Sequence, residues 1–359
     1  MKEKIAVLGD GGWGTTIAIL LSSKGYDVTL WGAFPDYIAL LQKERINRKF
    51  LPGIKIPEAI HLTSDINRIS RNSIFVIAIP SKYLRKTISG FKGKVGGKII
   101  SLTKGIETET LKRPSEIISE VLGLSSEAER RPVLRSHTRK QCGEGGSNSA
   151  KEGGLKISVL SGPSISFEVA RNLPTTLVAA SDEKIIAKET QAIFTTPNFR
   201  VYTSSDLTGV ELGGALKNII AIAAGISDGM GFGVNTKAAL LTRGLAEIIR
   251  LGAKLGAEKE TFFGLSGLGD LATTCVSTHS RNRRLGEEIG KGKKLKDILK
   301  ETEMIMEGIT TTKSTYELSK KIGVEMPITE KIYEVLYAGK NPKDAVKELM
   351  TRPLKAEGI

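Results

Sequence analysis

The sequence predicts an α/β domain built on a parallel sheet, followed by an all-helical domain. Three observations lead to this fold class. Short apolar runs typical of buried strands recur over residues 1–203, the periodicity over residues 204–359 is helical, and no strand–helix–strand unit appears in that second part. A chain of 359 residues is long enough for two domains with separate cores.

The first strand and the first helix enclose a glycine-rich turn. A strand at residues 5–8 runs into Gly9, Gly11 and Gly14, and a helical run then continues to Gly25. In a G-x-G-x-x-G turn the first glycine allows the tight bend, the second lets the backbone approach a pyrophosphate, and the third lets helix and strand pack closely. The pattern predicts a Rossmann-type dinucleotide-binding domain, with a plain glycine-rich turn as the alternative.

The second strand, at residues 28–31, does not decide between NAD and NADP. It is followed by Gly32, Ala33 and Phe34, and Asp36 comes late. An acidic residue at this point selects NAD through the ribose 2'-hydroxyl, whereas nearby arginines accommodate the 2'-phosphate of NADP. The sequence therefore leaves the choice of cofactor open.

Later strands are expected at residues 74–79, 98–102 and 157–160, each followed by polar or turn-forming residues. Ligands of open α/β sheets bind beyond the carboxyl ends of the strands, so Lys104 and Ser164 are expected at the functional edge. An ordinary surface lysine is the alternative for Lys104. Two further strands, at residues 175–180 and 200–203, flank a helix that we expect Ser181 to cap.

Residues 125–154 are poor in apolar side chains and rich in Arg, Ser and Gly, which predicts a disordered insertion. We interpret its basic half, residues 130–140, as a solvated loop, with lipid headgroups or another protein as alternative contacts.

The net charge of +14 is compatible with binding to nucleic acid, to an anionic membrane surface or to phosphorylated small molecules, and also with a plain solvated surface. Because no RGG tract, zinc finger or RNP-like pattern is present, no nucleic-acid partner is expected.

Localisation and metal content follow from what the sequence lacks. No uninterrupted apolar run reaches the ~18 residues that span a bilayer, and the charged N-terminus passes directly into a strand. We expect a cytoplasmic protein without a transmembrane segment. Cys142 and Cys275 form no CxxC pair and the three histidines are far apart, so neither a disulfide framework nor a metal site is expected.

The second domain is organised around Lys217, which lies in an almost uncharged run of helical length, residues 211–226. Its neighbours at helical spacing include Gly214 and Ala221, which cannot pair with an ammonium group. The lysine either extends to solvent or is held in a cleft as an acid or base. Further helices are expected at residues 237–254, 283–290, 295–301, 312–322 and 329–337.

Two polar groups stand out among these helices. Asp270 and Thr274 lie four residues apart and are expected to share one helical face. A run of donors suits a phosphate group, because guanidinium groups match phosphate oxygens; an ordinary solvated basic turn is the alternative. The members of this run are Arg281, Asn282, Arg283 and Arg284.

Together these motifs resemble the NAD(P)-dependent glycerol-3-phosphate dehydrogenases over nearly the whole chain. The resemblance is carried, in order, by the GxGxWG loop with Trp13, IAIPS at 77–81, LTKGIE at 102–107, LSGPS at 160–164, ELGGALKN at 211–218, GLGDL at 267–271, SRN at 280–282, EGITTT at 307–312 and MP at 326–327. It implies a Rossmann-type dinucleotide-binding domain, a helical substrate domain and a homodimer.

The resemblance also implies the roles of individual residues. Lys217 corresponds to the proton donor or acceptor. The residues implied for substrate binding are Lys104, Gly162, Ser164, Lys217, Asn218, Asp270, Ser280, Arg281 and Asn282. Those expected to contact the dinucleotide, NAD or NADP, are Gly9, Gly11, Gly12, Trp13, Gly14, Lys104, Ser166, Arg281, Ile305 and Glu307.

The implied reaction is hydride transfer between nicotinamide and C2 of glycerol 3-phosphate or dihydroxyacetone phosphate, which supplies glycerol 3-phosphate for phospholipid synthesis. Lys217 would exchange the proton, Lys104 would stabilise the developing charge, and Arg281 with Asn282 would anchor the phosphate. Burial and Lys104 lower the pKa of Lys217, and Asp270 raises it. The alternatives are a related dehydrogenase acting on a hydroxy acid such as 6-phosphogluconate and a dinucleotide-sensing nucleic-acid-binding protein.

The sequence departs from the family pattern at three places. Asp10 stands in the glycine loop where the family more often has alanine, and we expect its side chain to point away from the pyrophosphate. Ala33 and Phe34 stand where relatives often carry Arg or His beside the adenosine ribose. The insertion at residues 125–154 has no counterpart.

Overall fold

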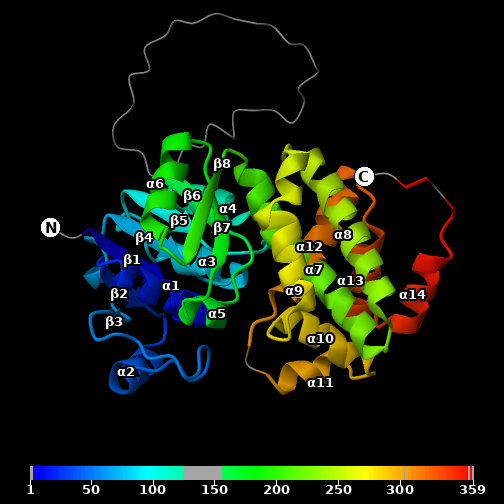
Figure 1. The fold of residues 1–359 in the computed structure, drawn as a ribbon, viewed down its shortest axis with the longest axis horizontal. Helices are drawn as coiled ribbons and strands as arrows, with labels where there is room; N and C mark the ends of the chain where they lie inside the picture. Colours follow the sequence, from blue (N-terminus) through cyan, green and yellow to red (C-terminus); the bar gives the residue numbers. More distant parts are fainter. Residues whose placement is uncertain (1–2, 124–155, 303, 355, 358–359) are drawn as a thin grey trace, which may run out of the picture.

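The computed structural model describes residues 3–123, 156–302, 304–354 and 356–357. Within them, a sheet with its flanking helices forms one half of the molecule, and helices α7 to α14 form the other (Figure 1). The fold class expected from the sequence, an α/β domain followed by an all-helical part, is confirmed. The insertion expected at residues 125–154 lies outside the described residues.

The sheet has the strand order β3-β2-β1-β4-β5-β6-β7-β8 and is parallel except between β6 and β7. Because the chain reverses its direction of travel across the sheet between β1 and β4, the carboxyl ends of these strands form the topological switch point at which open α/β sheets bind ligands. The strands are β1 Lys4–Leu8, β2 Asp27–Trp31, β3 His61–Thr63, β4 Ile74–Ile77, β5 Lys98–Ser101, β6 Lys156–Ser161, β7 Thr175–Ala180 and β8 Phe199–Ser204.

Helices cover both faces of the sheet, which explains why its strands are continuous apolar runs. In β1, Ile5 and Val7 belong to one core, whereas Ala6 and Leu8 belong to the core on the opposite face. The helices of this half are α1 Gly12–Ser23, α2 Pro35–Glu44, α3 Ser81–Ser89, α4 Pro114–Leu122, α5 Ser166–Ala170 and α6 Lys184–Phe194.

Two details differ from the expectations. The strand expected through Ile79 ends at Ile77, because Pro80 and the start of α3 follow closely. The expectation that Ser181 caps a helix is wrong. Its hydroxyl donates to the Ile157 carbonyl at 2.7 Å, and α6 begins only at Lys184. Ser181 therefore links the ends of two strands.

The helical half is built around α7 (Leu207–Gly229), which packs against α8, α9, α10 and α12. Its glycines let α10 approach closely: a Cβ on Gly225 would lie 1.9 Å from the Arg283 carbonyl oxygen, and one on Gly286 would lie 2.0 Å from that of Ile222. The other helices are α8 Val234–Lys254, α9 Asp270–Val276, α10 Arg281–Gly290, α11 Leu295–Lys300, α12 Glu307–Ile322, α13 Pro327–Tyr337 and α14 Pro342–Met350.

Among the helices that the structure describes, α7 alone is long and apolar enough to cross a membrane. Its whole apolar window is buried inside the protein. The surrounding helices and the sheet therefore already remove its apolar surface from water, as for a core helix.

Candidate active site

Lys217 is buried on α7, with 6% of its surface exposed. Its ammonium group donates to the carboxylate of Asp270 and, at 2.8 Å, to the hydroxyl of Thr274. Thr274 in turn donates to the backbone carbonyl of Asp270 at 2.7 Å, so these two residues do share one face of α9. The lysine is therefore held inside the protein and does not extend to solvent.

A second lysine from the sheet half meets the same carboxylate. Lys104, which follows β5, donates to Asp270 Oδ2 at 2.6 Å and to the Gly162 carbonyl, beyond β6, at 3.3 Å. Asp270 is 1% exposed, so one buried carboxylate holds two ammonium groups. The Ser164 hydroxyl also donates to the Gly162 carbonyl, at 2.9 Å. The carboxyl edge of the sheet and the helical half thus share one polar cluster.

The electrostatics of the cluster make Lys217 titratable near neutral pH. Burial lowers its pKa to about 8, Asp270 opposes that shift, and neighbouring Lys104 adds to it. Desolvation therefore outweighs the single shared carboxylate. An amine with this pKa can both give and take a proton near neutrality.

Glycines position Asp270 against Lys217. A π-helical turn, Leu265–Gly269, precedes α9 and lies directly against α7, where a Cβ on Gly213 would come 2.5 Å from the Ser266 carbonyl oxygen. A Cβ on Gly214 would lie 2.6 Å from the hydroxyl of Ser161. Because both positions are glycine, α7 can touch the turn and the end of β6 at once, which brings Lys217, Asp270 and Lys104 together.

Two asparagines extend the polar cluster. Asn282 donates to Asn218 Oδ1 at 3.0 Å and accepts from the Gly308 backbone N–H at 3.0 Å. The Nδ2 atom of Asn218 is buried and has no hydrogen-bond partner among the described residues. Since buried donors are normally paired, this amide is suited to a ligand oxygen. Ser280 caps α10 by accepting from the Arg283 N–H at 3.2 Å.

The four donors expected to form one cluster, residues 281–284, point in different directions because they lie on the first turn of α10. Arg283 donates to Asp228 at 2.7 Å, and Lys237 pairs with the same carboxylate at 2.6 Å. Successive residues of an α-helix point about 100° apart, so Arg283 faces α7 while Arg281 is exposed at the start of α10. The interpretation of four residues as one phosphate site is therefore wrong for Arg283.

Glu307, the first residue of α12, lies between the two halves. Burial raises the pKa of its carboxyl, and the positive charges of Arg281, Lys104 and Lys217 oppose that effect. The backbone N–H of Ser81, at the start of α3, also lowers this pKa. Of the remaining residues expected at the dinucleotide, Ile305 is half-buried just before α12. The backbone carbonyl of Ser166 accepts a hydrogen bond from the hydroxyl of Thr16 on α1 at 3.1 Å.

The glycine loop has the shape that a dinucleotide needs. A Cβ on Gly9, where φ is +116°, would lie 2.6 Å from the Ala78 carbonyl oxygen, one on Gly12 2.5 Å from that of Phe50, and one on Gly14 1.8 Å from that of Gly9. At Gly11, directly before α1, a Cβ would meet nothing within 4 Å. Protein packing requires the other three glycines, whereas Gly11 leaves open space at the helix N-terminus for a phosphate. Trp13 packs against the sheet core.

Sequence reasoning did not single out Ser161 and Ser81. The Ser161 hydroxyl is buried without a partner among the described residues, next to the place where α7 meets Lys104. Both serines stand in motifs that carry the family resemblance, which was the available signal.

In the part of the chain that the structure describes, no group of three or more His, Cys, Asp and Glu side chains is placed to hold a metal ion. Cys142 lies outside that part, and Cys275 is buried with its thiol pKa raised to about 12.

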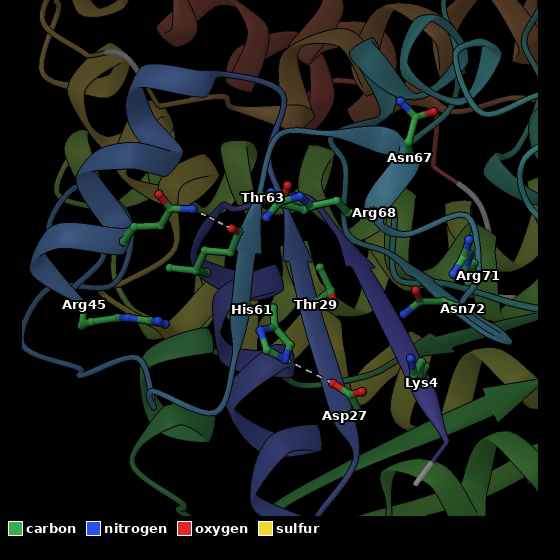
Figure 2. A pocket seen from close by; sticks show the side chains of 12 residues that line it. Lys4, Asp27, Thr29, Arg45, His61, Thr63, Asn67, Arg68, Arg71 and Asn72 are labelled. Carbon is green, nitrogen blue, oxygen red and sulfur yellow. Dashed lines mark hydrogen bonds and ion pairs between the residues drawn. The ribbon is translucent and has the colours of Figure 1, made fainter. Parts of the chain in front are cut away.

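A separate concavity of about 790 Å³ lies on the face of β1, β2 and β3 (Figure 2). Lys4, Arg68 and Arg71 line it, and His61 lies 3.6 Å from Asp27 there. None of the residues expected at the active site lines this concavity. The candidate chemistry therefore lies at the carboxyl edge of the sheet, away from it.

Comparisons with known proteins agree with this geometry. Residues 4–129 match the family model described as NAD-dependent glycerol-3-phosphate dehydrogenase N-terminus, and residues 206–347 match the C-terminus model. Proteins named glycerol-3-phosphate dehydrogenase [NAD(P)+] are 47% identical in Citrifermentans bemidjiense, over 100% of both chains, and 44% identical in Geobacter sulfurreducens, over 99% of both.

A solved structure gives the same result at the level of the fold. The crystal structure of glycerol-3-phosphate dehydrogenase from Coxiella burnetii superposes with a TM-score of 0.87 at 34% identity, covering 98% of this chain and 99% of that one. Both family models and full-length relatives thus agree with the resemblance seen in the motifs. The chain belongs to the NAD-dependent glycerol-3-phosphate dehydrogenase family.

Proposed function

We propose that this protein interconverts sn-glycerol 3-phosphate and dihydroxyacetone phosphate with NAD or NADP, and that Lys217 is the proton donor and acceptor. The observation that carries the proposal is the buried Lys217 with its pKa lowered to about 8, hydrogen-bonded to Asp270 at the edge where the sheet binds ligands. The names of the full-length relatives support the same reaction.

When bound, the dinucleotide supplies or accepts the hydride, so the protein orients the reactants and manages one proton. In the direction of reduction, Lys217 donates a proton to the oxygen on C2 of the substrate, and in oxidation it removes that proton. Lys104 stabilises the negative charge that develops on this oxygen. Asp270 accepts from both ammonium groups and so fixes their relative position.

The substrate and the dinucleotide then occupy neighbouring parts of the carboxyl edge. We assign the phosphate of the substrate to Arg281 and Asn282 at the start of α10, because the exposed guanidinium and the buried amide both offer donors there. The other proposed substrate contacts are Gly162, Ser164, Asn218 and Ser280. The proposed dinucleotide contacts are Gly9, Gly11, Gly12, Trp13, Gly14, Lys104, Ser166, Arg281, Ile305 and Glu307.

Three further proposals concern the protein as a whole. We assign residues 1–203 to the dinucleotide-binding domain and residues 204–359 to the helical domain, which the end of β8 at Ser204 supports. We propose a cytoplasmic enzyme whose product serves phospholipid synthesis. We also propose a homodimer, as the family resemblance implies; light scattering after size-exclusion chromatography tests it.

Initial rates with several substrates test the proposed reaction. We expect reduction of dihydroxyacetone phosphate with NADH or NADPH, and no oxidation of 6-phosphogluconate with NAD or NADP. Turnover of 6-phosphogluconate alone would favour a hydroxy-acid dehydrogenase. Retention on DNA that falls steeply with salt, without any reductase activity, would favour a nucleic-acid-binding protein.

A further inference from the structure

The carboxylate of Asp10, the second residue of the glycine loop, has no role in the proton transfer proposed above. Its Oδ2 atom is buried and has no hydrogen-bond partner among the described residues. Burial raises the pKa of this carboxyl, and its own backbone N–H opposes that effect. A buried acceptor without a donor costs free energy, so its presence in the loop requires an explanation.

Asp10 lies against the end of β2. Gly32 directly follows this strand, and a Cβ there would be 2.3 Å from Asp10 Oδ2 and 2.7 Å from the Cδ1 atom of Ile38. The carboxylate therefore occupies the space that a side chain at position 32 would fill. In dinucleotide-binding domains, an acidic side chain at the end of this strand recognises the adenosine ribose. Here the strand is followed by Gly32 and Ala33, and the glycine loop supplies the carboxylate instead.

Two arginines at and beyond the end of α2 are engaged with other partners. Arg45 pairs with Glu58 at 3.1 Å and donates to the Ile60 carbonyl at 2.9 Å. Arg48 pairs with Glu44 at 2.6 Å. A 2'-phosphate needs guanidinium or ammonium donors at this position. Both arginines would have to give up these partners to supply them.

We propose that Asp10 makes this protein select NAD(H) over NADP(H), because its carboxylate at the end of β2 places a negative charge where the 2'-phosphate of NADP would lie. The effect is one of charge and needs no direct contact with the ribose. It rests on the proposed placement of the dinucleotide on the glycine loop. It also explains why position 32 is glycine, since the Cβ atom of any larger residue would collide with the carboxylate of Asp10.

Binding of the two reduced cofactors to the full-length protein tests this inference without relying on turnover. Dissociation constants for NADH and NADPH are measured by nucleotide fluorescence for the wild type, for Asp10→Asn and for Asp36→Asn. Asp36 is an exposed acidic residue on the first turn of α2, so its variant removes the same charge nearby. Asp10→Ala provides the same measurement if Asp10→Asn does not fold.

We expect the wild type to bind NADH about tenfold or more tightly than NADPH, and Asp10→Asn to reduce that ratio about tenfold, mainly by tighter binding of NADPH. Asp36→Asn should leave the ratio within about twofold, because exposed charges are screened. A wild type that prefers NADPH, or an unchanged ratio in both Asp10 variants, overturns the role of Asp10 while leaving the proposed reaction intact. Failure of both nucleotides to bind the wild type overturns the proposed function as well.

Discussion

Two ammonium groups share one buried carboxylate in this protein, and the balance of charge around Lys217 follows from that arrangement. Burial disfavours the charged form of Lys217, while Asp270 favours it and Lys104 disfavours it again. Lowering the pKa from 10.5 to about 8 corresponds to about 3 kcal/mol of differential interaction. The cluster thus destabilises the charged form of Lys217 enough that the amine can gain and lose a proton near neutral pH.

Replacing Lys217 tests whether proton exchange is its role. We expect Lys217→Ala to abolish turnover while NADH binds with near-normal affinity. Lys217→Arg keeps a positive charge that does not titrate, so kcat should fall by about 10²-fold to 10⁴-fold. Steady-state kinetics and fluorescence titration measure these effects. The control, Lys237→Ala, removes an ammonium group that pairs with Asp228 and should leave kcat within about threefold. A substantially active Lys217→Ala variant contradicts the proposed role.

The pKa of Lys217 also predicts opposite pH dependences for the two directions. Reduction requires the ammonium form, so its kcat/KM should be level below about pH 8 and fall above it. Oxidation requires the neutral amine, so its kcat/KM should rise through the same pH. Asp270→Asn removes the group that raises this pKa, and both profiles should then move to lower pH. Oxidation that is fastest near pH 6 in the wild type would be inconsistent with Lys217 as the base.

At the level of elements, a carboxylate on α7 connects the helical half to the sheet half. Glu211 accepts from Arg113 at 2.8 Å and from the backbone N–H and hydroxyl of Ser115 at 2.8 and 2.6 Å. Arg113 and Ser115 lie at the start of α4, so Glu211 satisfies the N-terminus of a helix in the other half. This contact sets the position of α7, and with it Lys217, relative to the sheet.

Removing this carboxylate should destabilise the protein. We expect Glu211→Ala to lower the free energy of unfolding by about 3 kcal/mol, because Arg113 keeps, among the described residues, only its exposed partner Glu116 and the backbone N–H and hydroxyl of Ser115 lose their buried acceptor. Urea denaturation followed by circular dichroism measures the change. Glu116→Ala removes an exposed partner of the same arginine and should cost about 1 kcal/mol or less. Equal losses in the two variants would show that burial of the pair does not matter.

At the scale of the whole molecule, the net charge of +14 acts on ligands that carry phosphate groups. Positive potential around a binding cleft raises the local concentration of anions, and salt screens it over about 8 to 10 Å at moderate ionic strength. We expect the positive balance to favour capture of phosphorylated substrates, which needs no nucleic-acid partner.

Ionic strength should therefore affect substrate capture more than chemistry. Between about 50 and 500 mM salt, we expect the KM for dihydroxyacetone phosphate to rise several-fold while kcat changes little. Initial rates at saturating cofactor measure both constants. Unphosphorylated dihydroxyacetone provides the control, because a neutral substrate should show almost no salt dependence of kcat/KM. Equal salt dependence for the two substrates would exclude attraction of the phosphate as the cause.

The fold was largely predictable because its signals are local. Each buried strand is an apolar run, and Gly9 to Gly14 follow the first of them, so strand, turn and helix could be read from neighbouring residues. The short strand β3 was not anticipated, because three residues give weak periodicity, and the nine-residue helix α14 was missed as well. The motif residues of the family resemblance identified most members of the polar cluster.

The amino-acid sequence by itself determined the glycine loop, the order of strands and helices, and the types of side chain from which the site is built, since these depend on neighbours in the chain. The tertiary structure decided which of those side chains meet. Lys217 and Asp270 are 53 residues apart, and Lys104 and Asp270 are 166 apart. Only the packing of α7 against α9 and the sheet joins them. In the same way, the packing of α10 against α7 brings Arg283 to Asp228, and the pairing of β1 with β2 brings Asp10 against Gly32. Burial then sets the pKa of Lys217, because desolvation depends on the surrounding fold and not on the sequence next to the lysine.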